Sequence, residues 1–174
     1  CIRDRVGITR HCVKHNFLVK QVDGLANTIK KAFYLARTGR PGPVIIDVAK
    51  DVTQALHKFC YPQEQPFIRS YQPVIHAHKG QIKKAVQLFA LAKRPVVFFG
   101  GGIVLANAEE ELRRWIQLTG VPCVSSLMGL GAYSASHPQF LGMVGMHGTY
   151  EANMAMQQAD VVLALGVRFD DRVI

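Results

Sequence analysis

The sequence predicts an α/β fold, with a doubly wound parallel sheet preceded by the end of another α/β domain. Short apolar runs alternate with longer stretches of helical period along the 174 residues. Glycines follow two of these runs directly, at Gly100 and Gly166. The polar stretch 53–79, which contains three prolines, interrupts the pattern. We therefore predict the end of one domain at 1–52, a linker at 53–79 and a second domain at 80–174.

For residues 1–52 the sequence predicts two strands with a helix between them. Phe17 and Val19 alternate with polar neighbours, which is typical of a strand with one buried face. The stretch 25–37 has helical period, Gly39 ends it, and the β-branched run 44–48 is typical of a buried strand. The stripe of the helix that we expect to face the core is Leu25, Ile29, Ala32, Phe33 and Ala36.

The stretch 53–79 has no lasting period, and its prolines make a helix or strand improbable there. Aromatic residues lie between the prolines, and we expect them to hold this linker against a surface. These aromatic residues are Tyr61, Phe67 and Tyr71. His76 and His78 have strand spacing, but no third metal ligand is nearby, so a solvated linker is favoured over a metal site.

The second part begins with a predicted helix at 80–93 and a strand at 95–99. A helix should follow, with Asn107 as its N-cap, Glu110 completing a variant of the capping box and Gly120 at its end. The core side of the first helix is expected to be Ile82, Ala85, Val86, Phe89 and Ala92. That of the second is expected to be Leu112, Trp115 and Ile116.

The last elements are a strand at 121–126, a loop of small residues, a helix and a final strand. Thr149 suits the N-cap of that helix. The apolar run 161–165 is typical of a strand that is buried on both faces of a parallel sheet. The helix face expected to be apolar is Ala152, Ala155, Met156 and Ala159.

Ligands of open α/β sheets bind outside the carboxyl ends of the strands. We therefore expect the turns after Phe99, Ser126 and Leu165 to converge at one rim and form a ligand site. The glycine triplet that begins at Gly100 would let a phosphate approach the backbone. The triplet is not a GxGxxG motif, and no acidic residue follows at the distance that holds a ribose. Taken alone, it favours nucleotide binding and a tight packing turn equally.

Composition and charge argue against several function classes. The formal net charge is +9, but Lys and Arg are spread along the chain without interleaved aromatic residues, which disfavours nucleic-acid binding. No apolar run approaches the roughly 20 residues that span a bilayer, and the charged first residues do not form a signal peptide. The four cysteines lie far apart without a CxxC pair. We expect reduced thiols, no metal site, no membrane partner and a cytoplasmic location.

Five blocks of the sequence resemble the catalytic subunits of acetolactate synthases, also called acetohydroxyacid synthases. The blocks are KHNFLVK at 14–20, TGRPGPVIIDVAKDV at 38–52, SLMGLGAYSASHP at 126–138, GMVGMHGTYEAN at 142–153 and GVRFDDR at 166–172. The resemblance implies an internal fragment of a thiamine-diphosphate enzyme that also carries FAD. By this resemblance, 1–52 ends the domain that binds the thiamine pyrimidine ring, and 80–174 is an incomplete central FAD-binding domain. Members decarboxylate pyruvate and join the hydroxyethyl group to pyruvate or 2-oxobutanoate, a step of branched-chain amino-acid biosynthesis.

The resemblance also implies site residues and partners. The FAD contacts that it implies are Arg40, Gly101, Ser126, Leu127, Val144, Gly145, Met146, His147, Gly166, Val167, Arg168, Phe169 and Asp170. Lys50 and Arg172 match positions at the mouth of the substrate channel. The expected partners are 2-oxo acid substrates, further copies of the chain in a dimer or tetramer, and a small regulatory subunit. The family's catalytic glutamate and the GDG segment that holds thiamine diphosphate through Mg²⁺ have no counterpart here, so we expect this fragment alone to be inactive and to bind neither group.

Simpler interpretations accompany these residues. Arg168 would form a surface ion pair with Asp170 or Asp171, and His147 would brace the helix that follows it. Lys50 and Arg172 would be ordinary exposed cations. Two departures from the family are the Ala49 that replaces a usual proline and the poorly matching first six residues, on which no role is placed. The alternative functions are another thiamine-diphosphate enzyme, of the glyoxylate carboligase or oxidase type, and a non-catalytic flavin- or nucleotide-binding module.

Overall fold

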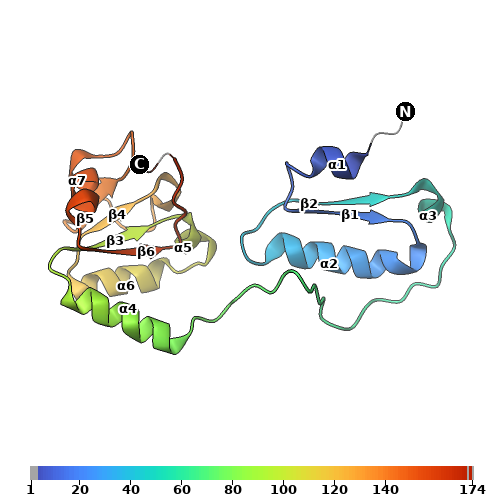
Figure 1. Cartoon of the computed structure of the whole chain (residues 1–174), viewed down its shortest axis with the longest axis horizontal. Helices are drawn as coiled ribbons and strands as arrows, with labels where there is room; N and C mark the ends of the chain where they lie inside the picture. Colours follow the sequence, from blue (N-terminus) through green and yellow to red (C-terminus); the bar gives the residue numbers. More distant parts are fainter. Residues whose placement is uncertain (1–3, 172, 174) are drawn as a thin grey trace. The chain divides into compact units, whose positions relative to one another are not determined.

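The computed structural model describes residues 4–171 and 173, and the chain divides into two compact units, Cys1–Ala77 and His78–Ile174 (Figure 1). The elements of the first unit are α1 (Arg5–Thr9), β1 (His15–Val19), the 3₁₀ helix η1 (Val22–Gly24), α2 (Leu25–Arg37), β2 (Val44–Val48) and α3 (Lys50–Gln54).

The first unit is built on a pair of parallel strands. His15 of β1 lies opposite Val44 of β2, and Val19 lies opposite Val48. Figure 1 shows α2 along one side of this pair and α1 on the other. The predicted bounds of α2 and β2 are confirmed, because their local signals, helical period and a β-branched run, agree with their tertiary contacts.

The apolar stripe of α2 is rotated from the predicted one. Ala32 and Leu35 are the buried residues of this helix, whereas Phe33 is 64% exposed. Neighbouring residues of a helix point about 100° apart, so burial centred on Ala32 and Leu35 turns Phe33 outward. The sequence pattern placed Phe33 in the core because it is large and apolar, which composition alone cannot distinguish from an exposed aromatic residue.

The segment that follows α3 runs along the first unit and is held by two of its three aromatic residues. Lys30 of α2 places its Nζ 5.1 Å from the ring centre of Tyr61 and donates to the carbonyl of Pro62 at 2.6 Å. Tyr71 packs edge-to-face on Tyr34 of α2, with ring centres 6.0 Å apart. Phe67 is exposed, so the expectation that it also pins this segment is wrong.

The second unit is a four-stranded, wholly parallel sheet with the order β5-β4-β3-β6. Its elements are α4 (Lys79–Leu91), β3 (Pro95–Phe99), α5 (Gly101–Leu105), α6 (Glu109–Thr119), β4 (Cys123–Ser125), the 3₁₀ helix η2 (Leu127–Gly129), β5 (Phe140–Met143), α7 (Tyr150–Gln158) and β6 (Val161–Leu165). The predicted α/β class with parallel strands and a doubly wound connection is confirmed.

The two faces of this sheet bury alternate residues of the central strand. Val97 and Phe99 of β3 join the core on the side of α6, while Val96 and Phe98 join the core on the side of α7. Figure 1 shows α6 and α7 on opposite sides of the strands. The predicted apolar face of α7 is confirmed, since Ala152 is fully buried and its other members pack around it.

Asn107 is not the N-cap that the sequence predicts. Two helices replace the single one expected, and Asn107 lies between them with a φ of 51°. Asparagine tolerates this left-handed conformation better than most residues, so it ends α5. The N-cap of α6 is Ala108, which makes no side-chain capping hydrogen bond. The glutamates of the first turn stabilise this end of the helix instead, because their negative charges lie at the positive end of the helix dipole. Gly120 ends α6 in the left-handed conformation, as predicted.

Two predictions about exposure are also wrong. The run 161–165 does form a strand, but Val162 is 37% exposed, because β6 pairs only with β3 at the edge of the described sheet. In α4 no residue is buried, and Phe89 reaches the core through Trp115, with ring centres 5.0 Å apart. Strand β5, which the sequence treats as loop, pairs in parallel with β4.

Asp160 joins the start of β6 to the segment before β3. Its carboxylate accepts the backbone N–H of Lys93 at 2.7 Å and that of Arg94 at 2.9 Å. These backbone hydrogen bonds hold the pKa of the carboxyl group below its ordinary value. No helix in the described part of the chain is long and apolar enough to cross a membrane.

Candidate functional site

Three turns of the second unit meet at the carboxyl ends of neighbouring strands. The N–H of Gly100 donates to the carbonyl of Leu165 at 3.0 Å, and the N–H of Ser126 donates to that of Phe99 at 2.9 Å. The N–H of Gly102 donates to the carbonyl of Gly166 at 2.8 Å. The predicted convergence of the turns after β3, β4 and β6 at one rim is therefore confirmed.

The glycines of this rim pack backbone against backbone. A Cβ added to Gly102 would lie 2.6 Å from the Cα of Gly166, and one added to Gly100 would lie 2.8 Å from the Gly166 carbonyl oxygen. At Gly101 the nearest atom would be the Cβ of Met128, at 2.9 Å. The tight packing turn, which was one of the two interpretations of the triplet, is thus what the structure shows.

The rim also lies where the strand order reverses. The chain passes from β3 outward through β4 to β5, and then returns on the other side of β3 as β6. In doubly wound sheets the ligand crevice lies outside the carboxyl ends at this point, between the first strand and the strand that returns. Here those two ends carry the glycine triplet and the charged segment that begins at Gly166.

The base of the loop between β5 and α7 is held by hydrogen bonds from the side chains of Thr149 and Asn153. Thr149 accepts the N–H of Ala152 at 3.2 Å, as the predicted N-cap, and its hydroxyl donates to the carbonyl of Leu141 at 2.6 Å. Asn153 accepts the N–H of Gly145 at 2.9 Å and donates to its carbonyl at 3.1 Å. Asn153 was not predicted as a site residue; its signal in the sequence is an amide four residues after the cap, on the side of the helix that faces the loop.

The tip of this loop remains open to a ligand. Within the described residues, the N–H groups of Met146 and His147 have no protein acceptor, and both side chains are exposed. His147 makes no hydrogen bond that would brace the helix, because Asn153 and Thr149 do so instead. Val144 belongs to the buried core, so only its backbone could face a ligand.

Exposed apolar side chains gather on these turns. Four apolar side chains that follow strands at this sheet edge are between 65% and 77% exposed. They are Leu127, Met128, Met146 and Phe169. Exposed apolar groups concentrated in this way mark a surface that binds a ligand or partner. Met128 was not predicted, because only its contact with Gly101 reveals that it belongs to the rim.

The charged segment after Gly166 is internally paired. Arg168 Nη2 lies 3.0 Å from Asp170 Oδ2, with side chains 67% and 27% exposed. The surface ion pair that was the simpler interpretation is therefore present, and an exposed pair of this kind contributes about 0–1 kcal/mol. A guanidinium has five N–H donors, so Arg168 retains donors for an anionic ligand.

Two buried polar groups lie under the rim. The hydroxyl of Ser125 is fully buried and has no hydrogen-bond partner among the described residues. Cys123, two residues earlier in β4, is also fully buried, and this burial raises the pKa of its thiol to about 12. Both side chains belong to the core rather than to the open surface.

Arg40 and Lys50 belong to the first unit. Arg40 is exposed on the loop between α2 and β2, and Lys50 is exposed at the first position of α3, after Ala49 as N-cap. The structure gives neither side chain a hydrogen bond or ion pair with another described residue. The third cation of the prediction, Arg172, lies outside the described residues.

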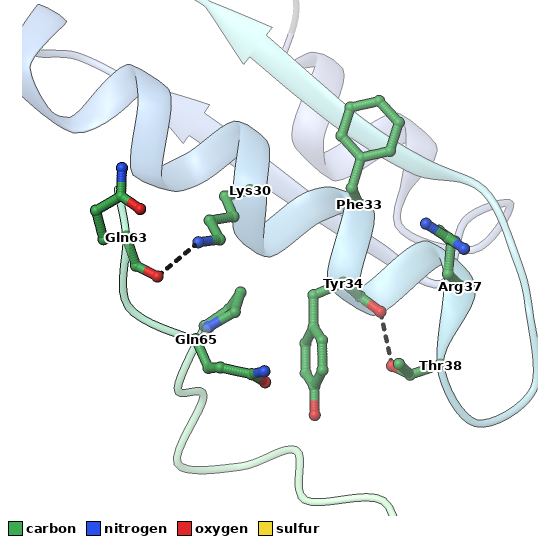
Figure 2. A pocket seen from close by; sticks show the side chains of 8 residues that line it. Lys30, Phe33, Tyr34, Arg37, Thr38, Gln63 and Gln65 are labelled. Atoms are coloured by element: carbon green, nitrogen blue, oxygen red, sulfur yellow. Dashed lines mark hydrogen bonds between the residues drawn. The ribbon is translucent and has the colours of Figure 1, made fainter. Parts of the chain in front are cut away.

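A hollow of about 450 Å³ lies elsewhere in the first unit, between α2 and the segment that follows α3 (Figure 2). Figure 2 shows Lys30, Phe33 and Arg37 along the helix and Gln63 and Gln65 on the facing segment. The Lys30 ammonium is engaged by carbonyls, and the hollow is wide open. No group of three or more potential metal ligands occurs in the part of the chain that the structure describes.

Comparison with known proteins adds a family to this geometry. Residues 82–174 match the model of the thiamine pyrophosphate enzyme central domain. The chain is 52% identical over 172 residues to the acetolactate synthase large subunit of Haemophilus influenzae, and 53% identical over 170 residues to the acetolactate synthase isozyme 3 large subunit of Escherichia coli. Each match covers 97% of this chain and 30% of the relative. The acetolactate synthase of Mycobacterium leprae is 46% identical over 170 residues, which are 98% of this chain and 27% of the relative.

Proposed function

Because the chain belongs to the thiamine pyrophosphate enzyme family through its central domain, we propose that it is a segment of the catalytic subunit of an acetolactate synthase. The observation that carries this proposal is the identity of 52–53% along 97% of the chain with two proteins of that name. The chain spans about 30% of the length of these curated relatives. The activity, substrates and partners of a whole enzyme are therefore part of the proposal.

The reaction of the whole enzyme would decarboxylate pyruvate and join the hydroxyethyl group to pyruvate or 2-oxobutanoate. Thiamine diphosphate, held through Mg²⁺, supplies the carbanion for this chemistry when bound. The residues that bind it would come from outside this segment, since its sequence has no GDG motif. Lys50 and Arg172 would attract the carboxylates of the 2-oxo acids. A small subunit and further copies of the large subunit would be partners, in the cytoplasm.

The rim of the second unit would hold FAD. Its fit rests on three features of the described residues: free backbone N–H groups at Met146 and His147, exposed apolar side chains, and the guanidinium of Arg168. Apolar side chains such as Phe169 would cover the flavin ring, while backbone and arginine donors would bind its anionic and carbonyl oxygens. The family resemblance also implies Arg40 as an FAD contact, and this contact is part of the proposal.

The reaction is tested on the full-length protein that contains this chain. With pyruvate, thiamine diphosphate, Mg²⁺ and FAD, we expect acetolactate to form. Carboligation of glyoxylate without acetolactate would favour the alternative thiamine-diphosphate enzyme. Flavin bound tightly without turnover of any 2-oxo acid would favour the non-catalytic module.

The rim is tested by flavin titration, followed by the quenching of flavin fluorescence. Arg168→Ala should weaken binding by about ten-fold or more, because a charge-assisted hydrogen bond is lost. Arg114→Ala is the matched control, since it removes the same exposed charge from α6 of the same unit. Equal affinity in both variants would remove Arg168 from the site.

A further inference from the structure

The loop that carries Arg40 is held by hydrogen bonds from side chains outside the loop. Lys14, which precedes β1, donates from Nζ to the carbonyl of Leu35 at 2.6 Å, to that of Thr38 at 2.6 Å and to Tyr71 Oη at 3.0 Å. An ammonium has three protons, so all three are used within the first unit. Lys14 therefore caps the C-terminal end of α2, where a positive charge also favours the helix dipole.

Tyr71 completes this arrangement from the segment that follows α3. Its hydroxyl donates to the carbonyl of Thr38 at 2.7 Å while it accepts from Lys14. The Thr38 hydroxyl lies 2.6 Å from the carbonyl of Tyr34, the nearer acceptor for its one proton, and 3.1 Å from Tyr71 Oη. Figure 2 shows the bond between Thr38 and Tyr34 at one end of the hollow. The Thr38 and Lys14 side chains hold the pKa of Tyr71 below its ordinary value. The contacts of Lys14 and Tyr71 with Thr38 are called the clasp below.

The rest of the loop fits closely around the clasp. Gly39 has a φ of 57°, and a Cβ there would lie 2.6 Å from Tyr71 Oη. The backbone N–H of Lys14 donates to the carbonyl of Pro43 at 2.8 Å, so Lys14 holds both ends of the loop. A proline follows Arg40 and restricts its backbone to extended conformations. Arg40 is thus an exposed, unpaired guanidinium on a backbone with little freedom.

We infer that Lys14 and Tyr71 are positioning residues for Arg40, because they lock the loop of residues 38–43 and so present its guanidinium to an anionic group of the ligand. This inference rests on the proposed function, which makes Arg40 a flavin contact. Binding residues held in place before the ligand arrives lose less conformational entropy on binding. Neither Lys14 nor Tyr71 needs to touch the ligand, since the hydrogen bonds of the Lys14 ammonium and the Tyr71 hydroxyl are made within the first unit.

The test compares four single variants of the full-length protein. Arg40→Ala removes the proposed contact, Lys14→Met removes the ammonium and keeps the length of the side chain, and Tyr71→Phe removes the hydroxyl alone. Tyr61→Phe is the matched control, since Tyr61 lies on the same segment and its hydroxyl makes no hydrogen bond among the described residues. Flavin affinity is measured by titration. Loop order is measured by hydrogen exchange of the backbone N–H groups of Thr38 and Gly42, which donate to carbonyls of α2.

We expect Arg40→Ala to weaken flavin binding about ten- to hundred-fold without changing exchange at Thr38 and Gly42. Tyr71→Phe and Lys14→Met should speed exchange there and weaken flavin binding about three- to ten-fold, and Tyr61→Phe should do neither. In the background of Arg40→Ala, Tyr71→Phe should cause no further loss of affinity, because it acts through the missing guanidinium.

Three results would overturn the inference. If Tyr71→Phe and Lys14→Met bind flavin as the unaltered protein does, while Arg40→Ala does not, the clasp does not position Arg40 and the proposed contact stands. The same conclusion follows if Tyr71→Phe lowers affinity equally with and without Arg40. If Arg40→Ala binds flavin with unchanged affinity, the proposed contact itself fails, and the positioning role fails with it.

Discussion

Replacing Gly102 by alanine tests the backbone packing of the rim turns. The added Cβ would lie 2.6 Å from the Cα and 2.7 Å from the carbonyl oxygen of Gly166, whereas carbon atoms in contact prefer about 3.5–4.0 Å. Since both obstacles are backbone atoms, the two turns must separate. This separation loses the hydrogen bond from Gly102 N–H to the Gly166 carbonyl, which contributes about 1 kcal/mol.

The net effect on the free energy of unfolding combines three contributions. Overpacking costs about 1–3 kcal/mol, the lost hydrogen bond costs about 1 kcal/mol, and alanine gains about 1 kcal/mol over glycine in the helix α5. We therefore expect Gly102→Ala to destabilise the second unit by about 2 kcal/mol. For the second unit, which spans residues 78–174, that corresponds to a fall in Tm of about 8–16 °C.

The assay is thermal and urea unfolding followed by the fluorescence of Trp115, the single tryptophan of the chain, which packs in the second unit. Gly80→Ala is the matched control, because Gly80 is also a helical glycine of this unit. Its added Cβ would meet only the side chain of His78, at 3.1 Å. The control should be neutral or up to about 1 kcal/mol more stable. A Tm of Gly102→Ala equal to or above that of the unaltered chain would refute the packing argument.

Three further predictions concern single groups of the second unit. Asp160→Asn should lower the free energy of unfolding at pH 7. Because the folded pKa of Asp160 is lowered, its contribution to stability is present above the unfolded pKa and is lost as the pH falls through the folded pKa. The unfolding midpoints of the variant and the unaltered protein should therefore converge in acid, and a constant gap between them would contradict this. Asn153→Ala should lower the free energy of unfolding by about 1–3 kcal/mol, because two hydrogen bonds to the Gly145 backbone are lost. Gln157→Ala, on the exposed side of the same helix, should lower it by less than about 0.5 kcal/mol, and urea unfolding measures both. Cys123 is buried with its thiol pKa raised to about 12, so it should resist alkylation at pH 8 until urea unfolds the chain, while the exposed Cys12 and Cys60 react at once. Mass spectrometry that resolves each cysteine measures this, and a Cys123 that reacts as fast as the other two would contradict it.

Signals that act locally made much of the fold predictable from the sequence. The helical period of residues 25–37, the cap at Thr149 and the left-handed end at Gly120 all depend on neighbours within a few residues. Phe33 and the run 161–165 were placed deeper than they lie, because exposure depends on which elements cover them in space. Asn107 was taken as a cap, although its backbone conformation makes it a break between two helices.

The candidate site was predictable in outline for a topological reason. Parallel strands bring their carboxyl ends to one edge, so the turns after Phe99 and Leu165 had to meet if the sheet was doubly wound. Asn153 and Met128 were missed, since their roles come from contacts with Gly145 and Gly101 that no spacing in the sequence encodes. The ligand of the rim stays a prediction of the family resemblance.

The contact between Gly102 and Gly166 also limits how this protein can evolve. Each glycine occupies the space of the other's missing side chain, and the obstacles on both sides are backbone atoms. No second mutation can delete a backbone atom, so a substitution at either position has no compensating partner. At Gly39 the nearest obstacle is the end of a side chain, the hydroxyl of Tyr71, but the φ of 57° there still favours glycine. We therefore expect neutral drift to leave the pair at 102 and 166 fixed.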